Sequence, residues 1–127
     1  MICKSAKVQF VPHDVIAGIL ALVKSEYLTG NRRKFHQAIH ELRESRQILK
    51  CFSFGQDSFS RTLDEILDFM ELSQLMTGEL PDFKRSILNT RAQKTIRQNL
   101  PQHFNGIQIK ELQQIAQKLE EICRPPF

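Results

Sequence analysis

The sequence predicts a mainly α (α+β) domain: five helices with a small antiparallel sheet. In the segment 58–75, apolar side chains recur at the spacing of helical turns: Leu63, Ile66, Leu67 and Met70. The segments 75–80 and 83–89 follow, separated by Pro81 and Asp82, residues that favour a tight turn between two strands. Four other stretches repeat apolar residues with the helical period, so we expect five helices and one hairpin.

The first helix is expected over residues 14–27, with Asp14 as its N-cap. Gly18 lies inside it. Because an interior glycine costs a helix about 1 kcal/mol relative to alanine, we expect it to permit close helix packing. Residues 1–12 form an arm that can add an edge strand, which Pro12 ends.

The second helix is expected over residues 32–45, because Gly30 suits the end of the preceding helix and Asn31 suits an N-cap. Residues 48–54 are apolar and nearly uncharged, which predicts a strand, and residues 55–57 form a turn.

The third helix occupies 58–75, with Ser58 or Ser60 as its cap, and the fourth runs over 91–100. We expect Thr90 to cap the fourth helix and Pro101 to end it.

The fifth helix is expected over residues 109–122, and its apolar residues form one stripe: Leu112, Ala116, Leu119 and Cys123. Such a stripe needs a partner surface, either in the same chain or in a second copy. We expect a single domain over 1–127, with a core at 13–100 and a helix at 107–123 that packs on it or forms a homo-oligomer.

Composition narrows the class of protein. A chain of 127 residues with 41% hydrophobic residues is the size of one globular domain. No segment reaches the roughly 18 uninterrupted apolar residues of a membrane span, and we expect a cytoplasmic protein. The net charge of +4 permits binding to a polyanion without requiring it.

Sites for catalysis, metals or cofactors are not indicated. Cys3, Cys51 and Cys123 form no C-x-x-C pair, and we expect Cys51 to be buried and the other two thiols to be free near the termini. His36 and His40 lie one helical turn apart, but a zinc site needs a third ligand, so half-exposed histidines are the simpler interpretation. We therefore expect no enzyme and no cofactor.

The charge is unevenly distributed along the chain. Residues 57–76 carry one basic and five acidic side chains, whereas residues 77–98 carry five basic and two acidic ones. A second basic cluster lies at 32–34. Carboxylates along the third helix would repel phosphates, so the basic side chains beside it are the expected polyanion contacts.

Three short segments carry a family resemblance. The strand-and-turn motif at 52–63, the helix motif at 67–76 and the strand-to-helix step at 86–93 resemble those of prokaryotic winged-helix proteins. In that family, an F-x-F/Y strand with a glycine turn precedes S-x-x-L and L-x-x-L. The resemblance covers about residues 48–98 and implies a winged-helix-like fold and a regulatory or a phage- and toxin-associated role, without catalytic residues.

Two functions follow as hypotheses. The first is nucleic-acid binding, with DNA as the partner, by a small transcriptional regulator or accessory factor. The expected contacts are Arg32, Arg33, Lys34, Ser60, Arg61, Lys84, Arg85, Arg91, Lys94 and Arg97. The alternative is a protein-interaction or structural module that docks a partner through the acidic third helix or the C-terminal helix.

Overall fold

A computed structural model describes residues 11–78 and 85–124. These residues form five α-helices, a short 3-10 helix and a three-stranded antiparallel sheet, which confirms the predicted mainly α class. The elements in chain order are α2 (Pro12–Leu22), β1 (Tyr27–Thr29), α3 (Arg32–Arg43), η1 (Gln47–Cys51), α4 (Arg61–Leu72), β2 (Met76–Gly78), β3 (Arg85–Leu88), α5 (Thr90–His103) and α6 (Gly106–Ile122). The edge strand expected before Pro12 and the turn at Pro81 and Asp82 lie outside the described residues, except for Val11.

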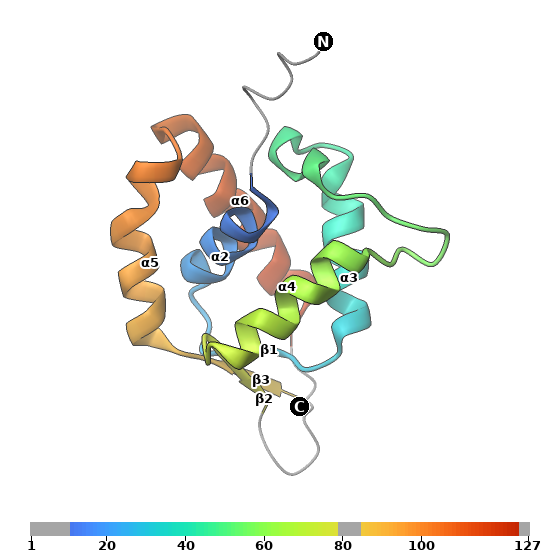
Figure 1. The fold of residues 1–127 in the computed structure, drawn as a ribbon, viewed down its shortest axis with the longest axis horizontal. Coiled ribbons are helices and arrows are strands. Elements are labelled where there is room, and N and C mark those ends of the chain that lie inside the picture. Colours follow the sequence, from blue (N-terminus) through green and yellow to red (C-terminus); the bar gives the residue numbers. More distant parts are fainter. Residues whose placement is uncertain (1–10, 79–84, 125–127) are drawn as a thin grey trace.

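Helix α2 is the centre of the molecule, with α5 on one side of it and α3 and α4 on the other (Figure 1). Val15, Ile19 and Leu20 are fully buried on it. A Cβ atom at Gly18 would lie 3.2 Å from methyl groups of both Leu100 and Leu112. The close packing expected at this glycine is therefore confirmed, because α5 and α6 both approach α2 there.

The sheet has the strand order β1-β3-β2, with both pairs antiparallel. Met76 lies opposite Leu88, and both side chains are buried, so the predicted hairpin faces the core with its apolar side. Strand β1 was not predicted. It pairs with β3, with Tyr27 opposite Ile87, and the first predicted helix stops at Leu22 to make room for it.

The predicted strand at 48–54 is wrong. Gln47–Cys51 is a 3-10 helix followed by extended chain. Ile48, Leu49 and Phe52 are buried while Lys50 is exposed, a pattern that a tight helical turn satisfies better than a strand. Short apolar runs of this kind fit either structure, which is why the pattern misled.

The apolar stripe of helix α6 packs against α2 and α3 of the same chain. Leu112, Ile115 and Leu119 are buried, so the partner surface that the stripe requires is supplied in cis. The helix begins earlier than predicted, because the Asn105 side chain accepts the Gln108 backbone N–H in a capping box.

Both described cysteines are free thiols, as expected for Cys123, but their burial differs from the prediction. Cys123 is fully buried, whereas Cys51, which was expected to be buried, is half-buried. Burial raises the pKa of the Cys123 thiol to about 12, so this group stays neutral and unreactive at physiological pH.

Helix α5 continues through Pro101, which was expected to end it. Proline so close to the end of a helix removes a single backbone hydrogen bond, and the helix keeps its remaining ones. Asn89, rather than Thr90, is its N-cap and accepts from the backbone N–H groups of Arg91 and Ala92. In the described part of the chain, no helix combines the length and apolarity needed to cross a bilayer.

Candidate functional site

The acidic face of α4 is bound by a single arginine from α3. The Nη1 atom of Arg32 lies 3.2 Å from Asp64, and its Nη2 atom lies 2.7 Å from Asp68 and 3.0 Å from Glu71. Asn31 caps α3 as predicted, accepting from the Arg33 N–H. This cap starts α3 at Arg32, beside the carboxylates of α4.

The pKa values of this cluster follow from its contacts. Partial burial alone would raise the pKa of Asp64, but hydrogen bonds from His36 and Arg32 outweigh it, and the pKa lies below its ordinary value. Burial alone would lower the pKa of Arg32, but the hydrogen bond to Asp68 and the charge of Glu71 outweigh it, and the pKa lies above its ordinary value. Arg32 is thus a permanently charged partner of α4.

His36 is buried, not half-exposed as expected from its sequence position. Its Nδ1 accepts the Ser60 backbone N–H at 3.1 Å, and its Nε2 lies 3.2 Å from Asp64. An acceptor role at Nδ1 requires the proton to reside on Nε2, which donates to the carboxylate. The ring stacks on Phe59 with centroids 4.6 Å apart, so the side chain joins α3 to the start of α4.

His40 lies one turn further along α3 and makes separate contacts. Its Nδ1 is 2.9 Å from the Ser58 hydroxyl, and its ring stacks on Phe54. Over residues 11–78 and 85–124, no group of three potential metal ligands comes together.

The start of α4 is occupied by contacts within the protein. Ser60 is buried, and its hydroxyl accepts the Leu63 N–H as the helix N-cap. Arg61 is exposed and lies 3.8 Å from Glu65. Of the two contacts predicted here, Ser60 is therefore part of the helix cap, whereas Arg61 remains exposed.

The two predicted basic clusters lie on different sides of the molecule. Arg33 and Lys34 are exposed on α3, whereas Arg91 and Lys94 are exposed on α5, across α2 (Figure 1). Strand β3 leads directly into α5, so Arg85 precedes the basic cluster of α5. The Arg85 guanidinium lies 4.3 Å from the centre of the Tyr27 ring. Lys84 lies outside the described residues.

Two polar side chains of α5 hold the end of α2. Gln93 is buried and donates to the carbonyl groups of Leu20 at 2.8 Å and Val23 at 3.1 Å. Arg97, one of the predicted phosphate contacts, donates to the Ala21 carbonyl at 2.9 Å. The sequence had no signal for this anchoring, because a glutamine on a helix is usually exposed.

No family model, curated protein or solved structure matches this chain. The candidate site is therefore defined by its own geometry.

Helix α5 and the strand before it form the candidate site. Residues 90–103 contain Arg91, Lys94 and Arg97 and no carboxylate, and the exposed residues among them are otherwise mostly threonine, asparagine and glutamine. Helix α4, by contrast, keeps a net negative charge even with Arg32 bound to it. A polyanion is thus attracted to α5 and repelled by α4.

Proposed function

We propose that this chain is a non-catalytic nucleic-acid-binding protein, a small winged-helix-type transcriptional regulator or accessory factor of the cytoplasm. Its interface is the exposed face of α5 together with β3, and the helix α4 contributes little. The observation that carries the proposal is the row of Arg91, Lys94 and Arg97 on a helix without carboxylates.

The order of elements supports this class. Helix α2, strand β1, helices α3 and α4 and then the β2–β3 pair follow one another, with β3 between the other two strands. A winged-helix unit has this order, and its hairpin lies along the nucleic-acid backbone. In this proposal Arg85 on β3 is the backbone contact of the hairpin.

The charge distribution favours α5 over α4 as the helix that contacts the nucleic acid. In a helix-turn-helix protein the second helix of the pair enters the major groove, which here would be α4. Asp64, Asp68 and Glu71 are already bound to Arg32, and Glu65 remains exposed beside Arg61. Backbone contacts through α5 avoid these carboxylates, so we expect affinity for duplexes with little dependence on base sequence.

The test is fluorescence anisotropy of a labelled mixed-sequence duplex at several salt concentrations. Three phosphate contacts predict that affinity falls about 40-fold between 50 and 200 mM salt. Lys94→Glu should weaken binding by about tenfold and reduce the salt slope by about one contact.

Lys50→Glu is the matched control, because it makes the same charge change at an exposed lysine on η1, across α2 from α5 (Figure 1). Absence of binding at 50 mM salt, or equal losses in the Lys94 and Lys50 variants, would contradict the proposal.

A protein-docking function is the second candidate, because α4 exposes large apolar side chains. Leu72 is 82% exposed and Phe69 is 51% exposed. Together with the acidic residues of the helix they make a surface typical of a protein contact. A dimer mass by light scattering, from a sample that binds no duplex, would favour this candidate over nucleic-acid binding.

A further inference from the structure

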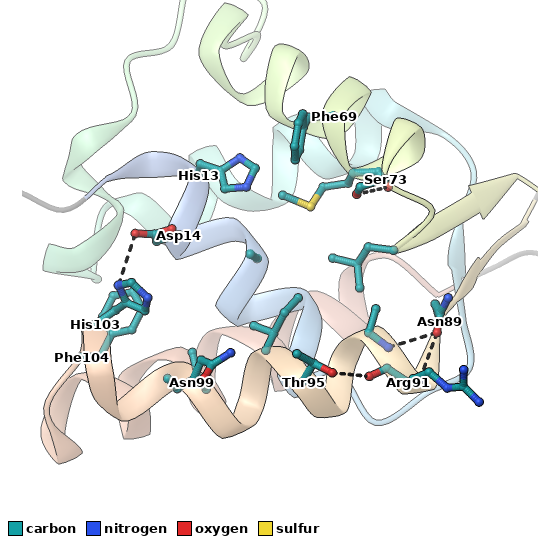
Figure 2. A pocket seen from close by; sticks show the side chains of 16 residues that line it. His13, Asp14, Phe69, Ser73, Asn89, Arg91, Thr95, Asn99, His103 and Phe104 are labelled. Atoms are coloured by element: carbon teal, nitrogen blue, oxygen red, sulfur yellow. Dashed lines mark hydrogen bonds and ion pairs between the residues drawn. The ribbon is translucent and has the colours of Figure 1, made fainter.

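A groove of about 590 Å³ lies between α2, α4 and α5 (Figure 2). Sites for small organic molecules have volumes of about 300–1,000 Å³ and combine apolar walls with a few polar groups. The groove was not predicted, because its walls come from three segments far apart in the sequence.

The walls are apolar and partly aromatic. Phe69 and Met70 of α4 form one wall, Ala92 and Ile96 of α5 form the other, and Ala17 of α2 lies between them. The His13 ring meets Phe69 edge to face, with centroids 4.8 Å apart (Figure 2). Walls of this kind favour a flat apolar molecule, since aromatic rings stack or meet edge to face at such distances.

The polar groups of the groove differ at its two ends (Figure 2). At one end the Asp14 carboxylate lies 3.8 Å from Nδ1 of His103. At the other end lies Arg91, whose exposed side chain extends outward from the rim of the groove (Figure 2) and forms no ion pair with any described residue. The two ends of the groove thus carry opposite charges, and an anionic group is complementary to the end at Arg91.

We propose that this groove binds a small organic anion with a flat apolar body, whose carboxylate or sulfonate lies at Arg91. The groove shares Arg91 with the proposed nucleic-acid interface, but the inference is independent of nucleic-acid binding because it is tested without nucleic acid.

Two probes with nearly the same aromatic body separate shape from charge. Anilinonaphthalene sulfonate is anionic, and N-phenyl-1-naphthylamine is its neutral counterpart. Fluorescence titration of the full chain should show saturable binding of both, with the anion about tenfold tighter, the effect of one charge-assisted contact.

Variants then locate the site. Thr95→Phe, at an exposed lining position, should weaken both probes about tenfold or more by filling the groove, whereas Thr77→Phe on β2 makes the same change outside it. Ala92→Phe should fill the groove more deeply. If the Ala92→Phe protein does not fold, the binding measured with Thr95→Phe is the test of the site. Equal binding by the Thr95 and Thr77 variants would overturn the proposal.

Charge is tested with a second matched pair. Arg91→Gln should remove the preference for the anionic probe, whereas Lys94→Gln, which removes an equal charge on α5 outside the groove, should keep it. The assignment of the anion to Arg91 fails if the two variants behave alike, or if the wild-type chain binds both probes equally or neither.

Discussion

At the scale of single residues, Asp64 has contacts that its sequence position did not reveal. Its carboxylate accepts from both Arg32 and His36, at 3.2 Å each. The sequence placed it on the acidic third helix, for which docking of a partner was one of the two hypotheses. Contact with Arg32, 32 residues away, depends on how α3 packs against α4.

This contact predicts a loss of stability in acid. The folded-state pKa of Asp64 is lowered, so below the unfolded-state pKa of about 3.9 the unfolded chain binds more protons than the folded chain. The stabilisation is complete above that value and is lost as pH falls through the folded-state pKa. Urea unfolding midpoints between pH 7 and pH 3 should fall less steeply for Asp64→Asn than for the parent.

Asp57→Asn is the control, because Asp57 is exposed and forms no ion pair within the described residues. An identical pH dependence in the two variants would show that the contacts of Asp64 do not stabilise the fold.

At the scale of elements, the end of α4 uses a residue that the sequence pattern did not suggest. Gln74 has φ of 66°, the left-handed region where glycine is favoured. The Leu75 N–H donates to the Met70 carbonyl at 3.0 Å, which closes the helix as in a Schellman motif. The predicted helix ran on to residue 75, because no glycine marked this end.

Replacing Gln74 with glycine should therefore stabilise the protein. Relief of the left-handed backbone is worth about 1–2 kcal/mol, and the extra freedom of glycine in the unfolded chain cancels part of it, which leaves a gain of about 0.5–1 kcal/mol. Gln113→Gly makes the same change at an exposed interior position of α6 and should cost about 1 kcal/mol. Urea denaturation of both variants measures these opposite signs; destabilisation by both would contradict the argument.

At the scale of the whole molecule, α2 is buried because other elements cover several of its sides. Helices α4, α5 and α6 all contact it, and Gly18 lies where α5 and α6 approach. The sequence predicted close helix packing at Gly18. It did not show that α6, expected as an appended packing or oligomerisation helix, is part of the same core.

A chain that stops after residue 103 should therefore lose its cooperative unfolding transition. It lacks Leu112, Ile115 and Leu119, each worth about 1.5–3 kcal/mol of burial, against a total stability of about 5–15 kcal/mol. A chain that stops after residue 124 is the control and should unfold cooperatively, as followed by circular dichroism. Cooperative unfolding of the shorter chain would mean that the core at 13–100 folds without α6.

The sequence alone determined the features that depend on neighbours within one or two helical turns. The apolar spacing of α4, the Asn31 cap and the two strands of the hairpin were predicted from local pattern, since helix and turn hydrogen bonds join residues close in the chain. Tertiary structure decided the partner of β1, the burial of His36 and Cys123, and which charges remain available to a ligand. Those depend on contacts between distant segments, which arise when helices pack around α2, and they leave α5 rather than α4 as the basic surface.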